Sequence, residues 1–302
     1  MTDPRPNRPQ TPENLHREPL PLLRDRPLES HKNRFGLALI VGGSRGMCGA
    51  AGLAGMGALR GGAGLVRLAV PDACLATVAG FEPSCMTVGL PSDRAGRLAL
   101  GAKAPLARLM DAATAVGCGP GLGRSAGLDV LVAWLYTHVA KPMVVDADGL
   151  NALAARPEAL ARPAGPRVLT PHPGEFARLL GADRLPNERL RALAVELAGR
   201  CQAVVVLKGH CTLITDGQRE AINTTGNPGM ATGGSGDVLT GLITALICQS
   251  VPPFDAARLG VYLHGLAGDL AAEQLSQEAM IASDLVRFLP DAFKVYRGQM
   301  AR

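Results

Sequence analysis

The sequence predicts an α/β fold, a three-layer αβα sandwich with a central, mostly parallel sheet. Short apolar runs rich in Val, Ile and Leu alternate with longer helical stretches, which is the pattern of a sheet covered by helices on both faces. Several of the runs end in a glycine-rich loop or in a carboxylate. Because ligands of such sheets bind at the carboxyl ends of strands, the same pattern predicts where a functional site lies.

The elements follow one another from residue 35 onward. The predicted strands are residues 35–41, 65–70, 113–117, 142–146, 168–170 and 203–208, with 211–216 as the hairpin partner of the last. The predicted helices are residues 50–60, a stretch with Trp134 and Tyr136, a helix after residue 175, and residues 237–248, 255–276 and 283–296. We expect the loops at the strand ends to converge, namely 42–49, 119–123 and 172–175 with Asp146, Lys208 and Asp237.

The chain divides into three parts. Residues 1–33 are rich in Pro and Arg, which predicts a disordered arm, although its leucines allow its end to pack on the domain. One domain is predicted over residues 34–297, followed by a C-terminal tail at 298–302.

Composition excludes several classes of protein. The seven cysteines are scattered without a CxxC pair, which disfavours a disulfide framework or a zinc site and indicates a reduced, cytoplasmic setting. No apolar run reaches the roughly 18 residues of a membrane span, and no signal peptide precedes the domain. The net charge of +5 comes without a basic block interleaved with aromatics, so nucleic-acid binding is not expected. An anionic small molecule suits this balance.

The most informative segment is residues 227–237, with the sequence NPGMATGGSGD, which opens onto an apolar helix. Glycines at a helix start present backbone N–H groups to an anion, above all phosphate. A carboxylate beside bound phosphate is unfavourable because both groups are negative, unless a cation offsets the charge or the carboxylate acts as a base. Asp237 is therefore interpreted as the base that takes a proton from a substrate hydroxyl. The alternative is that Asp237 is an ordinary helix N-cap. Neither GxxxxGK[ST] nor a GxGxxG after the first strand occurs, so a bound nucleotide must use another glycine loop.

Seven motifs in this order resemble those of the NAD(P)H-hydrate dehydratases, a family of the ribokinase-like superfamily. The resemblance spans roughly residues 35–295. The TPHPGE and DADGLN strings separate this branch from sugar kinases. The motifs are VGGS at 41–44 with 49–50, RGGAGLV at 60–66, GPGLG at 119–123, VDADGLN at 145–151, TPHPGE at 170–175, LKG at 207–209 and NPGMATGGSGD at 227–237.

The resemblance implies a ribokinase-like fold and a repair reaction. The substrate would be the S epimer of NAD(P)HX, the hydrated form of NADH or NADPH with a hydroxyl on C6. Bacterial and archaeal members use ADP and eukaryotic members use ATP, and the absence of eukaryotic targeting favours ADP, with release of AMP and phosphate. Mg²⁺ is the implied cofactor. Because about 33 residues are too few for the epimerase domain fused to many bacterial relatives, we expect a separate epimerase. The family also implies a homo-oligomer, a tetramer.

Roles for the phosphate-handling residues follow from the same resemblance. Asp237 would be the catalytic base for the C6 hydroxyl, and Gly234, Ser235 and Gly236 the anion hole for the transferred phosphoryl group. His210 and Cys211 stand where the family has small residues, so the geometry of that segment is expected to differ. For Lys208 the alternative is a surface lysine at the end of the strand, and for His210 it is a loop histidine without a catalytic role. The nucleotide contacts would be Lys208, Gly209, His210, Cys211, Thr212 and Gly236.

The substrate and metal positions are carried over in the same way. Ala50, Gly123 and His172 would contact substrate together with Asp237, the first two through their lack of bulk; the alternative for both is close packing. Glu175 would hold magnesium through water, and its alternative is a first-turn helix glutamate. Asp146, Asp148 and Asn151 order their loop or help orient magnesium, and the sequence favours the ordering role.

Two other functions remain open. A small-alcohol kinase of the hydroxymethylpyrimidine or thiazole type would share the glycine loop and Asp237 but release a stable phosphoester. A catalytically silent nucleotide-binding regulator would have no use for a carboxylate beside phosphate. The product distinguishes the three: orthophosphate with a dihydronicotinamide, an organic phosphate, or nothing.

Overall fold

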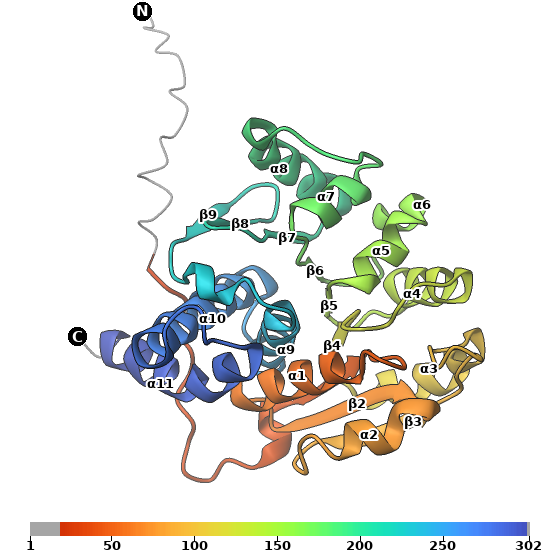
Figure 1. Ribbon diagram of the computed structural model, residues 1–302, viewed down its shortest axis with the longest axis horizontal. Helices are drawn as coiled ribbons and strands as arrows, with labels where there is room; N and C mark the ends of the chain where they lie inside the picture. The colour runs from red at the N-terminus through yellow and green to blue at the C-terminus, as the bar shows by residue number, and fades with distance from the viewer. Residues whose placement is uncertain (1–18, 301–302) are drawn as a thin grey trace, which may run out of the picture.

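The computed structural model of the protein describes residues 19–300, which form a nine-stranded sheet in the order β3-β2-β1-β4-β5-β6-β7-β8-β9 (Figure 1). The strands pair in parallel from β3 to β7, and β8 and β9 continue the sheet as antiparallel strands. The predicted mostly parallel sheet is thereby confirmed. The strands are β1 Leu37–Val41, β2 Leu65–Pro71, β3 Met86–Leu90, β4 Ala115–Cys118, β5 Met143–Val145, β6 Arg167–Leu169, β7 Val204–Leu207, β8 Thr212–Thr215 and β9 Glu220–Asn223.

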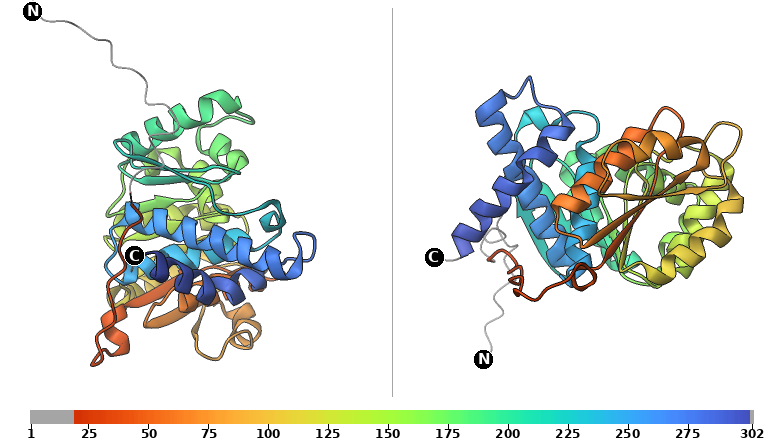
Figure 2. Two further views of the ribbon diagram at one scale, coloured as in Figure 1. Left: turned by 90° about the vertical axis from the view of Figure 1, so that its left-hand side faces the viewer. Right: turned by 90° about the horizontal axis from the view of Figure 1, so that it is seen from below.

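Helices cover both faces of this sheet, as two further views show (Figure 2). In β1, Ala38 and Ile40 face one hydrophobic core while Leu37, Leu39 and Val41 face the other, because successive strand side chains alternate. The helices α1 Cys48–Arg60, α2 Leu75–Ala79, α9 Ser235–Cys248, α10 Pro253–Leu275 and α11 Ala282–Met300 cover the first face. The helices α3 Lys103–Ala112, α4 Ala126–His138, α5 Asp148–Ala154, α6 Pro157–Leu160, α7 Pro173–Leu179 and α8 Leu190–Cys201 cover the second.

The predicted strands and helices are all present, with small shifts at their ends. Prediction missed the edge strands β3 and β9, which lie at the two ends of the sheet and are mostly half-buried. It also missed the short helices α2, α5 and α6, together with α3 and α8. No helix within residues 19–300 is long and apolar enough to cross a membrane.

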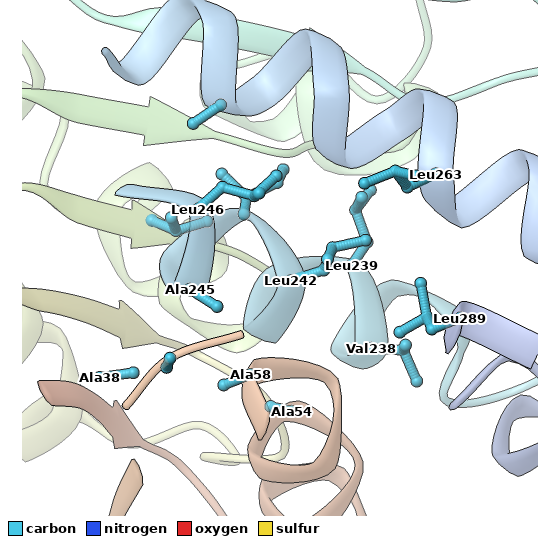
Figure 3. Close-up of a cluster of buried hydrophobic side chains, with 14 of the residues drawn as sticks. Ala38, Ala54, Ala58, Val238, Leu239, Leu242, Ala245, Leu246, Leu263 and Leu289 are labelled. Atoms are coloured by element: carbon cyan, nitrogen blue, oxygen red, sulfur yellow. The ribbon is translucent and has the colours of Figure 1, made fainter. Parts of the chain in front are cut away.

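Helix α9 lies directly against α1, and their close approach positions the glycine loop that precedes α9. Its apolar residues pack between α1 and α10, with Leu242 and Ala245 in the same core as Ala58 (Figure 3). Gly241 permits this contact, since a Cβ there would lie 1.9 Å from the carbonyl oxygen of Ala54. The many small residues noted in the sequence therefore serve helix packing at this face.

The end of the N-terminal arm packs on the domain. Leu23 is buried, and its backbone N–H donates to the Tyr296 hydroxyl at 2.8 Å. Arg26 donates to the carbonyl of Gly62, whereas Leu28 is fully exposed. The part of the predicted disordered arm at residues 1–18 lies outside the described residues, as do residues 301–302 of the tail.

Candidate active site

The carboxyl ends of the parallel strands bring together the segments that were expected to converge. Gly43 donates its N–H to the carbonyl of Pro120 at 2.7 Å, which joins the loops after β1 and β4. After β5, the backbone of Asp146 donates to the carbonyl of Cys118 at 3.0 Å. After β7, the Lys208 ammonium reaches the Asp146 carboxylate. The predicted convergence is confirmed.

A buried ion pair occupies the centre of this end of the sheet. Lys208 Nζ lies 2.7 Å from Oδ1 of Asp146 and 3.7 Å from Oε2 of Glu175. The side chain of Asp146 is 1% exposed and that of Lys208 is 22% exposed. Lys208 is therefore not the surface lysine of the alternative interpretation.

Helix α7 presents Glu175 through a capping box. The N-cap is His172, whose Nδ1 accepts from the backbone N–H groups of Gly174 and Glu175 at 3.0 and 3.3 Å. In return the Glu175 carboxylate accepts from the backbone N–H of His172 at 2.8 Å. The first-turn helix role of Glu175 is thus confirmed, and the imidazole of His172, half of it exposed, has a capping role of its own.

The glycine loop ends at Gly234, which adopts a left-handed conformation with φ of 98° and is the N-cap of α9. Asp237 therefore lies in the first turn of the helix, and the N-cap alternative for it is wrong. A left-handed residue at this position suits glycine, which has no Cβ to clash. The predicted helix start at 237 is two residues late for the same reason.

The predicted anion hole, residues 234–236, contains groups with different contacts in the structure. The Ser235 hydroxyl donates to the carbonyl of Met230 at 2.8 Å, so this side chain stabilises the loop. Gly236 lies against the ion pair, since a Cβ on it would be 3.3 Å from Lys208 Nζ and 3.4 Å from Asp146 Oδ2. An anion at the start of α9 would consequently meet both the backbone of the loop and the Lys208 ammonium.

Electrostatics distinguish Asp237 from an ordinary surface carboxylate. Burial, and then the negative charge of Asp146, raise the pKa of Asp237 to about 7, with Lys208 opposing them. For Lys208, burial lowers the pKa, but the charges of Asp146 and Glu175 outweigh it, so the net shift is upward and the ammonium stays charged. A carboxyl group with a pKa near neutrality can accept a proton from a hydroxyl more readily than an ordinary aspartate.

Two cavities flank this centre. The larger, of about 760 Å³, has on its walls the apolar residues Leu239 and Val261 and several of the predicted residues. Cys211 lies in the same turn, with an exposed side chain that does not line the cavity. The predicted residues that line it are His172, Lys208, Gly209, His210, Thr212, Ser235 and Gly236.

The smaller cavity, of about 320 Å³, contains Gly123 on its wall together with Asp148 and Asn151. The N–H of Gly123 donates to Asp148 Oδ2 at 2.8 Å, and Asn151 Nδ2 donates to the other oxygen at 3.2 Å. Asp148 and Asn151 thus order the loop, as the sequence favoured. Because the N–H of Gly123 is already bonded to Asp148, Gly123 could favour a ligand only through its lack of a side chain. Ala50, near the start of α1, lies beside Gly121, since a Cβ added to Gly121 would be 2.9 Å from that of Ala50.

The side chains fit a magnesium ion held mainly by phosphate and water. Glu175 places one carboxylate at the edge of the site, but that carboxylate already accepts from His172 and faces Lys208. Within residues 19–300, no group of three or more His, Cys, Asp or Glu side chains is arranged to hold a metal directly. Mg²⁺ usually keeps several waters and few protein ligands, so a water-mediated contact with Glu175 is compatible with this geometry.

Sequence reasoning missed three residues that support the site. Thr240 Oγ1 donates to Asp146 Oδ2 at 2.9 Å. His264 of α10 is buried, which lowers its pKa to about 4, and its Nε2 lies 2.9 Å from the carbonyl of Ser235. Asp269, five residues further along α10, accepts from the N–H of Gly226 and from the Asn227 side chain. Each of these residues is distant in sequence from the group that it bonds, and no local sequence motif predicts the contact.

Comparison with known sequences agrees with this arrangement. The profile of the NAD(P)H-hydrate dehydratase family matches residues 38–291. The bifunctional NAD(P)H-hydrate repair enzyme Nnr of Moorella thermoacetica is 49% identical over 88% of this chain and 50% of its own length. The ADP-dependent (S)-NAD(P)H-hydrate dehydratase of Neisseria meningitidis is 42% identical over 81% of this chain and 80% of its own. The chain thus spans about half the length of the bifunctional relatives.

Comparison with solved structures gives the same result. A ribokinase-like superfamily protein of Enterococcus faecalis is 27% identical, with a TM-score of 0.79 over 91% of this chain and 92% of that protein. The ADP/ATP-dependent NAD(P)H-hydrate dehydratase of Bacillus subtilis, co-crystallised with ATP and Mg²⁺, is 32% identical, with a TM-score of 0.75 over 90% of this chain and 94% of that protein. The fold is ribokinase-like, and the chain belongs to the NAD(P)H-hydrate dehydratase family.

Proposed function

We propose that this protein catalyses the ADP-dependent dehydration of the S epimer of NAD(P)HX to NAD(P)H, with release of AMP and phosphate. The single observation that supports this most is the position of Asp237, in the first turn of α9 directly after a glycine loop, with a pKa of about 7. That combination suits a base that works beside a phosphoryl group. Family membership supports the choice of substrate.

The reaction needs a leaving group better than hydroxide. The carboxylate of Asp237 takes the proton of the C6 hydroxyl, and that oxygen attacks the terminal phosphorus of ADP while the bond to AMP breaks. The lone pair of the ring nitrogen then expels phosphate from C6, and loss of a proton from C5 completes the dihydropyridine. The hydroxyl of the hydrate thereby leaves as part of orthophosphate, which balances the atoms.

The residues of the larger cavity are assigned to the nucleotide. Gly209 and Thr212 form the turn after β7, where the Thr212 hydroxyl lies 3.1 Å from the carbonyl of Gly209, and this turn would hold the nucleotide beside Lys208. The N–H groups of Gly234, Ser235 and Gly236 would stabilise the charge of the phosphoryl group in transit, that of Ser235 in exchange for its 3.4 Å bond to the carbonyl of Thr232. A donor of this kind typically contributes ~3–4 kcal/mol to the transition state.

The substrate would approach past Ala50 and Gly123 to Asp237, and it would meet His172 where that side chain borders the larger cavity. A magnesium ion, when bound, would neutralise phosphate charge and contact Glu175 through water. His210 would border the nucleotide without a catalytic role, and Cys211 would lie next to it in the same turn, outside the cavity wall. The proposal also includes a homotetramer and a separate epimerase that acts on the other epimer, both of which rest on the sequence resemblance. It includes a cytoplasmic location, which rests on composition.

A small-alcohol kinase is the second candidate. It is favoured by the shared fold, since the hydroxyethylthiazole kinase of Pyrococcus horikoshii has a TM-score of 0.57 to this chain. At 19% identity this likeness concerns the fold alone. The two candidates differ in their product, because a kinase releases a stable phosphoester and a dehydratase releases orthophosphate.

The deciding experiment mixes the purified protein with the verified S epimer of NADHX in four cuvettes: ADP with Mg²⁺, ATP with Mg²⁺, ADP with a chelator, and no nucleotide. Recovery of the dihydronicotinamide absorbance, with AMP and orthophosphate formed in equal amounts in the first cuvette, is the expected result. No recovery with either nucleotide would contradict the proposal. An organic phosphate formed from a thiazole or pyrimidine alcohol would then establish the kinase.

A further inference from the structure

We propose that Asp146 is a positioning residue for the reaction: its buried carboxylate holds the Lys208 ammonium against the start of α9, where the phosphoryl group is transferred. The inference rests on the function proposed above and adds a residue to its machinery. The side chain of Asp146 is only 1% exposed and both of its oxygens already accept hydrogen bonds, so it would act through Lys208.

The carboxylate is fixed from both sides. Its Oδ1 accepts from Lys208 Nζ at 2.7 Å, and its Oδ2 accepts from Thr240 Oγ1 at 2.9 Å. The Thr240 hydroxyl also lies 3.1 Å from the carbonyl of Gly236, but its single proton favours the charged acceptor. One side chain from the end of β5 thereby links the end of β7 to the second turn of α9.

The backbone that carries this side chain is equally constrained. The N–H of Asp146 donates to Cys118 at 3.0 Å, and its carbonyl accepts from Gly149 at 2.9 Å. The next residue, Ala147, has a φ of 50° and a ψ of −119°, a conformation that costs energy for a residue with a side chain. Gly119 packs against the same carbonyl so closely that a Cβ on it would lie 1.8 Å from that oxygen.

Stability alone does not account for such a pair. Burying the Asp146 carboxylate and most of the Lys208 side chain costs desolvation free energy, which their attraction does little more than offset. Apolar side chains of similar size are often as stable in a buried setting. A lysine on its own is a flexible point charge with several rotatable bonds. Held by Asp146, the Lys208 ammonium has a defined position relative to Gly236, the glycine whose backbone lies directly against the pair.

The charge of Asp146 also acts on the base. The groups around Asp237 are Asp146, Asp148 and Glu175, which raise its pKa in addition to burial, and Lys208, which lowers it. His264 of α10, buried and with its pKa lowered to about 4, adds no positive charge near neutral pH. Neutralising Asp146 should therefore move the pKa of Asp237 downward, a change that a merely structural residue would not produce.

The test is Asp146→Asn, which keeps the shape and removes the charge, compared with wild type in the dehydration assay. We expect kcat to fall about 100-fold through loss of positioning. The KM for ADP should rise by much less than kcat falls, because Lys208 contacts the nucleotide in the ground state too but its defined position matters most in the transition state. The acid limb of the kcat profile should also move to lower pH. The matched control is Glu220→Gln, which removes a carboxylate from an ion pair of the same 2.7 Å length with Arg191, on strand β9; its kcat should equal wild type.

Thr240→Val provides a second variant that leaves the ion pair in place and removes one anchor of the carboxylate. We expect a loss of about 10-fold in kcat, in keeping with a hydrogen bond to a charged group. If Asp146→Asn does not fold, the kcat of Thr240→Val tests the positioning role of Asp146 in its place. Wild-type kcat in Thr240→Val, or in a folded Asp146→Asn with an unmoved acid limb, would overturn the assignment.

An activity-independent measurement separates this proposal from the proposed function. The ammonium resonance of Lys208 in NMR spectra of the whole protein should show slow rotation and proton exchange in wild type, and should broaden or vanish in Asp146→Asn. An unchanged resonance would overturn the positioning role whatever the enzyme turns over. Absence of NAD(P)H formation by wild type, with the resonance behaving as expected, would instead count against the dehydratase function.

Discussion

Asp237 and Asp146 place two carboxylates at the same end of the sheet, and the charge of Asp146 adds to burial in raising the pKa of Asp237 to about 7. Lys208 interacts with both carboxylates. Its ammonium pairs with Asp146 at 2.7 Å, and its positive charge lowers the pKa of Asp237 by less than burial and Asp146 raise it. A base that is half-protonated near neutral pH follows from this arrangement.

The pH dependence of turnover should report that base. Only the ionised form of Asp237 can accept the proton, so kcat/KM should fall below a pH of about 7 and approach a tenfold loss per pH unit. Initial rates in constant-ionic-strength buffers would show it. A profile that stays flat down to about pH 5 would mean that a group with the ordinary pKa of a carboxylate acts instead.

Asp237→Asn removes the base while keeping the shape of the side chain. We expect turnover to fall about 10²–10⁴-fold, the usual contribution of general-base catalysis. ADP binding, measured by calorimetry, should stay close to that of wild type because the loop and Lys208 are unchanged. A variant that keeps more than about a tenth of the wild-type rate would show that Asp237 is not the base.

The same substitution should stabilise the protein at alkaline pH. The pKa of Asp237 rises from 3.8 in its ordinary state to about 7 in the folded protein. The folded state therefore binds the proton more tightly, and ionisation between these values favours unfolding. Near pH 8, Asp237→Asn should exceed wild type by about 2–4 kcal/mol in free energy of unfolding, at ~1.4 kcal/mol per pKa unit. Urea denaturation should show this difference vanish near pH 4, and a constant difference would point to another cause.

Two glycine substitutions test the contact between α1 and α9. Gly241→Ala places a Cβ 1.9 Å from the carbonyl oxygen of Ala54, so the helices must separate, and we expect a loss of about 3 kcal/mol in the free energy of unfolding, at the upper end for an overpacked site. Gly49→Ala in the first turn of α1 meets nothing within 4 Å. It should be neutral or stabilise by about 0.5–1 kcal/mol, because alanine favours the helix. Thermal denaturation of both variants checks the contrast, and equal melting temperatures would contradict it.

The arm contact can be tested with Tyr296→Phe. The Tyr296 hydroxyl accepts from the N–H of Leu23 at 2.8 Å and donates to the carbonyl of Pro21 at 2.5 Å. Losing both bonds should cost about 1–2 kcal/mol and speed proteolysis around residues 19–26. Tyr262→Phe is the control, since its hydroxyl bonds only the exposed side chain of Gln299 among the described contacts. Equal cleavage rates in the two variants would show that the hydroxyl of Tyr296 does not hold the arm.

Much of the fold could be predicted because its elements carry local signals. Strand β1 is a continuous apolar run, as expected for a strand buried on both faces, and α9 is an unbroken apolar helix after a glycine loop. Strands β3 and β9 were missed because they lie at the edges of the sheet and are mostly half-buried, so they lack the continuous apolar run of a central strand. The start of α9 was misplaced because the left-handed Gly234, and not Asp237, caps the helix.

The sequence by itself determined the family, seven of the nine strands, and the segment 227–237 that carries Asp237, since each depends on residues close together in the chain. Tertiary structure decided what surrounds Asp237. The pairing of Lys208 with Asp146, 62 positions apart, and the bond from Thr240 to the same carboxylate, 94 positions apart, exist only once β5, β7 and α9 meet. Burial and neighbouring charge set a proton affinity, and both are properties of the assembled fold rather than of any segment.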